Sequence, residues 1–146
     1  MVDLRTILQD HKSKHKDLKD LHDMEVSKAL TKETQPTVSE IPDLFFDSIL
    51  VDYKLSRIEI IVLMYLYRRV WCRPNLYKKH GISQLLSHTE MAKALNLAIE
   101  DVFSALRKIE SYGFIITFRS GQYFVRKYFT KAHDEAFGQT YDDFEL

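Results

Sequence analysis

The chain has 146 residues, of which 45% are hydrophobic, so it can bury one substantial core. Its longest apolar run, residues 60–67, is far shorter than the roughly 20 residues of a bilayer-spanning helix, and its one cysteine, Cys72, excludes an internal disulfide. We therefore expect a cytoplasmic protein. Acidic and basic residues balance at 21 each, but residues 41–131 carry fourteen Lys/Arg against eight Asp/Glu. This local excess permits a nucleic-acid partner despite the neutral total.

Residues 1–40 predict a polar extension rather than part of the core. Several leucines and an isoleucine have helical spacing, but His11, Lys14 and His15 interrupt the stripe where a coiled coil needs apolar residues. We expect a partly helical or disordered segment, with its weak amphipathic helix as a candidate homodimer interface. His11 and His15 are four residues apart, but there is no Cys and no ligand cluster near them, so no metal site is predicted.

The composition becomes globular at Ile41. In LSRIEIIVLMYLYRRVW, residues 55–71, Ser56 and Glu59 form a Ser-x-x-Glu capping box, in which each side chain satisfies a backbone amide left unpaired by the first helical turn. The β-branched run that follows is compatible with a strand, but the cap and the length favour a helix. Because this helix is apolar almost all round, we expect it at the centre of the core.

Two amphipathic helices and a hairpin are predicted next. SHTEMAKALN, residues 87–96, starts with a second Ser-x-x-Glu box and ends at Asn96, which tolerates the left-handed conformation that closes many helices. IEDVFSALRKIES, residues 99–111, has apolar residues at helical spacing, with Gly113 as its stop. Alternating strands then flank an Arg-Ser-Gly turn over residues 114–128. This order is that of a helix-turn-helix followed by a wing.

The hairpin is expected to turn one face to the core and to carry a basic tip. The seven aromatic residues between positions 110 and 129 are interpreted as packing rather than as platforms for base stacking. The hairpin side chains that remain for a partner are Arg119, Gln122, Arg126 and Lys127.

Residues 41–129 resemble the winged helix at the N-terminus of phage replication protein O and, more loosely, DnaD-like replication and MarR-like transcription proteins. IPDLFFDSIL is similar to the start of those domains, with Asp43 where Asn is usual, and residues 55–71 are similar to their central helix. LSHTEMAKALNLAIEDVFSALRKIESYGFI is similar to the two helices and the first strand of the wing. The resemblance implies a mainly α fold with a small β-hairpin, a winged helix-turn-helix, in a protein that binds double-stranded DNA as a transcription or replication regulator.

The start of the second helix departs from this pattern. DNA-binding members usually place Ser, Thr, Arg, Gln or Asn there, whereas this chain has Glu100 and Asp101, which repel phosphates. We expect backbone contacts from residues farther along the helix, namely Ser104, Arg107 and Lys108. The same acids favour an alternative class, a winged-helix adaptor that binds protein.

No motif for catalysis or a cofactor occurs, and we expect neither: GxGxxG, a P-loop, Gly-x-Ser-x-Gly, HExxH and CxxC are all missing. Cys72 is interpreted as a packed thiol. Arg68, Arg69 and Arg73 are candidates for binding a phosphate or a nucleotide ligand, because guanidiniums bind phosphate bidentately. The alternative is that they pair with acids of the fold, for which the candidates are Asp43, Asp47 and Asp52.

Residues 132–146 form an acidic, aromatic tail without Lys or Arg. Such a segment could dock its aromatic rings and cover the basic residues Arg119, Arg126 and Lys127, or it could serve as a peptide for a protein partner. A solvated terminus is the alternative.

Overall fold

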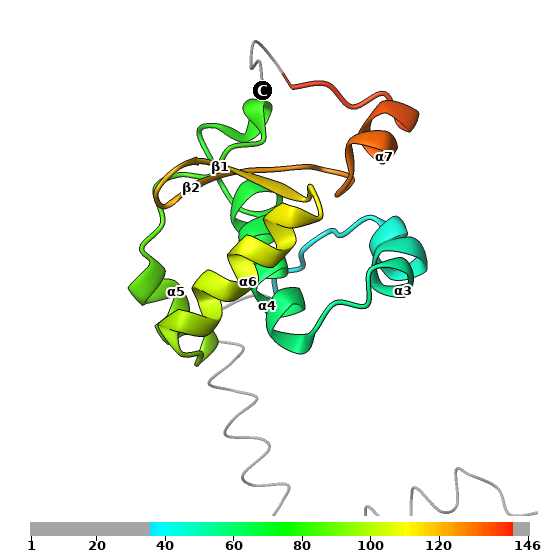
Figure 1. Ribbon diagram of the computed structural model, residues 1–146. Helices are drawn as coiled ribbons and strands as arrows, with labels where there is room; N and C mark the ends of the chain where they lie inside the picture. The colour runs from blue at the N-terminus through cyan, green and yellow to red at the C-terminus, as the bar shows by residue number, and fades with distance from the viewer. Residues whose placement is uncertain (1–35, 142–146) are drawn as a thin grey trace, which may run out of the picture. The chain divides into compact units, whose positions relative to one another are not determined.

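The computed structural model describes residues 36–141, and contacts divide the chain into two units, Met1–Val38 and Ser39–Leu146. The described part of the second unit is mainly helical with one two-stranded antiparallel sheet, as the sequence predicts (Figure 1). The predicted N-terminal helix, with His11 and His15, lies outside the described residues.

The first described helical segment is η1 (Phe45–Ile49), which continues into α3 (Leu50–Asp52). Pro42 precedes it, and the Phe45 amide donates to the Pro42 carbonyl at 3.0 Å. Phe45 and Ile49 are buried, and the Phe45 ring lies 5.2 Å from the ring of Phe129. This contact joins the start of the unit to its C-terminal part.

Helix α4 (Arg57–Tyr67) begins at the predicted capping box. The Ser56 hydroxyl accepts from the Glu59 amide at 3.2 Å, and Glu59 accepts from the Ser56 amide at 3.4 Å. The π-helical turn η2 (Arg68–Cys72) extends α4 and ends at Arg73, which is extended because Pro74 follows. The fully buried side chains of this helix, Val62, Leu63, Leu66 and Val70, confirm its predicted place in the core.

Helices α5 (His88–Leu95) and α6 (Ile99–Ser111) follow the short 3-10 helix η3 (Lys78–His80) and an extended segment. The Ser87 hydroxyl caps α5 by accepting from the Glu90 amide, and Asn96 takes the predicted left-handed conformation, with φ 54°. α6 packs along α4 and α5, with Val102 and Ile109 fully buried. Gly113 has φ 84° and allows the chain to turn out of α6 into the hairpin.

The strands β1 (Ile115–Arg119) and β2 (Gln122–Val125) form the hairpin, with a bulge between Thr117 and Arg119. The predicted alternation is wrong for the return strand, because β2 stops at Val125 and all four of its residues are buried. Its other edge is covered by residues 81–86: the Ser83 amide donates to the Tyr123 carbonyl at 2.9 Å, and the Val125 amide donates to the Gly81 carbonyl at 2.8 Å. β2 therefore lies between two segments of chain.

Gly121 allows both the tight turn of the hairpin and the close approach of residues 81–86 to β2. It has φ 82°, and a Cβ there would lie 2.6 Å from the Leu86 carbonyl oxygen. The Leu86 amide donates to the Gly121 carbonyl at 2.7 Å, so residues 81–86 approach the turn closely. Any larger side chain at this position would be strained and would clash.

The C-terminal segment packs on the same unit through α7 (Lys131–Ala136) and Tyr141. Asp134 is buried, and its carboxylate accepts from the Tyr141 hydroxyl at 2.6 Å, while the Tyr141 ring lies 4.7 Å from that of Phe124. The boundary predicted between residues 131 and 132 thus falls inside packed structure. Across residues 36–141, no helix has the length and apolar character needed to cross a membrane.

Candidate functional site

The outward face of α6 carries the helix residues predicted to contact DNA. Ser104, Arg107 and Lys108 are all exposed, on the opposite side from the core residues of this helix. Glu100 and Asp101, in the first turn, are exposed too, and Ala98 supplies no side-chain cap. The face is therefore acidic at its start and basic over its last two turns.

Ser104 and Lys108 lie toward one flank of this face. They line a groove of about 280 Å³ together with Ser56 and Glu59, at the start of α4, and with Asp101. The Lys108 ammonium lies 5.4 Å from the centre of the Tyr112 ring. Two carboxylates share this groove with Lys108, whereas Arg107 is not among the residues that line it.

At the hairpin tip, Arg119 is exposed and held by a buried glutamine. The Arg119 Nε donates to Gln122 Oε1 at 2.8 Å, and Gln122 Nε2 donates to the Ser83 carbonyl at 2.9 Å. Gln122 is only 5% exposed, so it positions Arg119 rather than facing a partner. This hydrogen bond uses only Nε of Arg119, and the residue is exposed.

The other two hairpin cations lie against the fold. Arg126 forms an ion pair with Asp134 at 3.2 Å and donates to the Gly113 carbonyl at 3.3 Å, and its side chain is 11% exposed. The Lys127 ammonium lies 5.7 Å from the Trp71 ring and 5.9 Å from that of Tyr128. Of the four hairpin residues predicted to contact DNA, only Arg119 is both charged and exposed.

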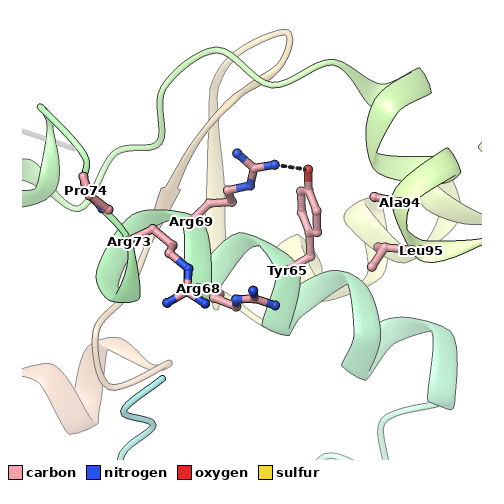
Figure 2. A pocket seen from close by; sticks show the side chains of 7 residues that line it. All are labelled: Tyr65, Arg68, Arg69, Arg73, Pro74, Ala94 and Leu95. Atoms are coloured by element: carbon pink, nitrogen blue, oxygen red, sulfur yellow. Dashed lines mark hydrogen bonds between the residues drawn. The ribbon is translucent and has the colours of Figure 1, made fainter. Parts of the chain in front are cut away.

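A second candidate site, the arginine pocket, lies at the C-terminal end of α4 and along η2 (Figure 2). Its volume is about 560 Å³. Figure 2 shows Arg69 reaching the hydroxyl of Tyr65, while Ala94 and Leu95 extend from α5 across the pocket. The residues that line the pocket are Tyr65, Arg68, Arg69, Arg73, Pro74, Ala94 and Leu95.

The guanidiniums of this pocket have neutral partners. Arg69 Nη2 donates to the Tyr65 hydroxyl at 3.0 Å, and the guanidinium lies 5.1 Å from the centre of the Tyr65 ring. Arg73 Nη1 donates to the Cys72 carbonyl at 3.2 Å. Within residues 36–141 the one arginine that forms an ion pair is Arg126, with Asp134, so the acids expected as alternative partners of the pocket arginines do not pair with them. Those acids were Asp43, Asp47 and Asp52.

Three tyrosines are buried beside these surfaces, and burial raises the pKa of each above the usual 10.0. The Tyr67 hydroxyl donates to the Lys127 carbonyl at 2.9 Å. For Tyr141, the hydrogen bond to Asp134 raises the pKa further after burial, and for Tyr123 the negative charge of Glu110 does so. At neutral pH the hydroxyls of Tyr67 and Tyr141 therefore keep their protons and donate to the Lys127 carbonyl and the Asp134 carboxylate.

Sequence reasoning missed Tyr65, the apolar wall of the arginine pocket, and Asp134 as the partner of Arg126. Tyr65 and Arg69 are four residues apart on a helix, a spacing that brings side chains together and could have revealed this pair. Leu95 comes from a different helix, and no local pattern connects it to the arginines. Cys72 is half-buried, with its thiol 3.4 Å from the Glu40 carbonyl, which agrees with a packed thiol.

Comparisons with protein-family models, with curated proteins and with solved structures find no match to this chain. In the described range, no cluster of three or more His, Cys, Asp or Glu side chains is arranged to hold a metal ion. The candidate sites of the described range are therefore its two basic surfaces, α6 with the hairpin tip and the arginine pocket.

Proposed function

We propose that residues 41–131 form a winged helix-turn-helix that binds double-stranded DNA, in a protein that regulates transcription or replication. In this proposal α5 and α6 are the helix-turn-helix, α6 faces the major groove, and the hairpin β1–β2 is the wing. The function requires no catalytic residue and no cofactor. A single, unpaired cysteine suits a cytoplasmic location.

The observation that supports the proposal best is the set of exposed cations on α6 and at the hairpin tip. Arg107 lies on the outward face of α6, and Gln122 orients the exposed Arg119. Guanidiniums in such positions can contact phosphates on either side of a groove, which fixes the register of a protein on DNA without reading bases. Because Glu100 and Asp101 repel phosphates at the start of α6, the binding energy should come mainly from backbone contacts.

A second candidate function is that of an adaptor that binds another protein through the same surface. Phe103 on α6 is 39% exposed, and Phe118 on β1 is 52% exposed. Exposed aromatic side chains are enriched where proteins bind proteins, and acids in the first turn of α6 are compatible with a basic partner. In that case, α6 and the hairpin would have lost affinity for DNA.

A mobility-shift titration on random duplex DNA at two salt concentrations separates these functions. A protein with Z phosphate contacts loses affinity with a slope of about −0.9Z in log K against log salt. Arg107→Gln with Arg119→Gln should weaken binding to all sequences alike and reduce the slope by about two. Lys78→Gln with Lys79→Gln, on exposed residues of η3, is the charge-matched control. Absence of binding at both salt concentrations would favour the adaptor.

A further inference from the structure

The arginine pocket concentrates positive charge, and the described residues that line it include no acid. Arginine stays charged at any physiological pH, so three guanidiniums within the six residues from Arg68 to Arg73 repel one another. None of the residues that line the pocket within residues 36–141 is acidic, and no carboxylate in that range forms an ion pair with these arginines. An anion bound between them would relieve this repulsion.

Two of the guanidiniums are held by hydrogen bonds within the fold. Arg69 uses one nitrogen for the Tyr65 hydroxyl, and Arg73 uses one for a backbone carbonyl. A guanidinium has five N–H donors, so each retains several. Because these contacts limit the rotamers of the two side chains before binding, less conformational entropy is lost when a ligand arrives.

The walls of the pocket indicate what kind of anion fits. Guanidiniums match the geometry of phosphate oxygens, which they bind in bidentate fashion. The remaining lining is apolar or aromatic, from Tyr65, Pro74, Ala94 and Leu95, and the volume of about 560 Å³ lies within the range of about 300–1,000 Å³ typical of small-molecule sites. We propose that the arginine pocket binds a small phosphorylated molecule of nucleotide size, with its phosphate on the guanidiniums and its apolar part against the opposite wall.

The three arginines could instead stabilise the end of the helix or contact DNA. Each of these roles explains fewer features of the arginine pocket than binding of a small molecule does. Basic residues in the last turn of a helix stabilise the helix dipole, but that effect does not explain the apolar wall that α5 contributes. A phosphate of the DNA backbone would offer the same chemistry to the arginines. The concave shape and the apolar wall favour a separate small molecule, since contacts to DNA backbone need neither.

Thermal melting of the full chain tests the proposal directly. Inorganic pyrophosphate and adenosine monophosphate should raise the melting temperature in a concentration-dependent way, because a ligand that binds only the folded state stabilises it by mass action. Adenosine, which lacks the phosphate, should have no such effect. Sodium sulfate at the same ionic strength controls for general anion effects, and calorimetric titration then gives the affinity for pyrophosphate.

Charge-matched variants locate the site. Replacing Arg68, Arg69 and Arg73 by Gln should weaken pyrophosphate binding at least about tenfold. The control replaces three exposed cations elsewhere, Arg57, Lys79 and Lys131, by Gln and should keep the affinity. Arg69→Lys alone, which keeps the charge but loses the planar fork, should also weaken binding, and it serves as the test if the triple variant does not fold.

Three outcomes would overturn the proposal. The first is that pyrophosphate stabilises the protein no more than sulfate does. The second is that the pocket and control variants lose affinity equally. The third is that neither small ligand binds while the pocket variant loses affinity for a DNA duplex, which would assign the arginines to DNA. Since the Arg107 and Arg119 variant leaves this pocket intact, it should still bind pyrophosphate, so failure of the DNA proposal is distinguishable from failure of this one.

Discussion

Two groups of arginines in this domain have opposite surroundings. Arg126 is nearly buried, and its guanidinium meets the Asp134 carboxylate at 3.2 Å and the Gly113 carbonyl at 3.3 Å. In the arginine pocket, Arg68 and Arg69 are exposed. Arg69 donates to the Tyr65 hydroxyl and Arg73 to a backbone carbonyl. Arginine thus stabilises the fold in one place and remains available to a ligand in the other.

The comparison shows that a basic residue cannot be assigned to a binding surface from its charge alone. Arg126 is close in sequence to the exposed Arg119, yet a carboxylate from α7 neutralises it. An unpaired charge near the surface is hydrated at little cost, whereas a buried charge needs a partner. The presence of that partner therefore separates structural arginines from candidate ligands.

Removal of the Asp134 carboxylate should have the largest effect, because it would leave Arg126 buried without its ion partner. We expect Asp134→Ala to destabilise the protein by about 3–5 kcal/mol, since breaking a buried pair leaves an uncompensated charge. The Tyr141 hydroxyl and the Tyr128 amide would lose their acceptor too. Chemical denaturation measures the change, with Glu135→Ala on the exposed side of α7 as the control. Equal stability of the two variants would mean that the ion pair is dispensable.

High pH should lower the stability of the protein, because the fold raises the pKa values of Tyr67 and Tyr141. The folded pKa values of Tyr67 and Tyr141 lie above 10.0, so above pH 10 the unfolded chain releases protons that the folded chain retains. The unfolded state then binds fewer protons, and the free energy of unfolding falls as pH rises. Tyr67→Phe and Tyr141→Phe should each make this fall shallower in denaturation curves recorded from pH 8 upward. An unchanged slope in both variants would contradict the effect of burial on the two pKa values.

Removal of a helix cap should have a smaller effect on stability. Ser56→Ala and Ser87→Ala should each cost about 1 kcal/mol, because each hydroxyl accepts a backbone amide at the start of a helix. The Ser56 hydroxyl also donates to the Glu59 carboxylate at 2.7 Å, so its replacement should have the larger effect. Thermal melting can rank the two variants, with Ser120→Ala at the exposed hairpin turn as a control.

Neutralising the arginine pocket should have the smallest effect on stability. Without ligand, replacing its three arginines by Gln should leave the melting temperature unchanged or raise it slightly, because mutual repulsion is removed and no ion pair is lost. Arg126→Gln, in contrast, should lower the melting temperature markedly. A large loss of stability in the pocket variant would show that these arginines hold the fold together and would remove the contrast between the two groups.

The local pattern of the sequence determined where α4 and α5 begin and where α5 and α6 end. Ser56 and Ser87 cap α4 and α5 through residues three positions away, and Asn96 and Gly113 adopt the left-handed conformations expected of helix stops. These features involve neighbours within one turn, so residue type and spacing suffice to predict them. The burial of α4 could be predicted as well, because a helix that is apolar on nearly every side has few other stable positions.

Tertiary structure alone decided which of the polar and aromatic residues are accessible. β2 is buried on both edges because residues 81–86, some forty positions earlier, pair with it, as the hydrogen bonds of Gln122 and Tyr123 with Ser83 show. The arginine pocket likewise needs Leu95 from α5 opposite side chains of α4 and η2. Contacts of this kind depend on the path of the chain between the partners, which side-chain periodicity does not encode. For that reason Gln122 and Arg126, which the sequence made candidates for DNA contact, became structural residues, while Arg119 remained exposed.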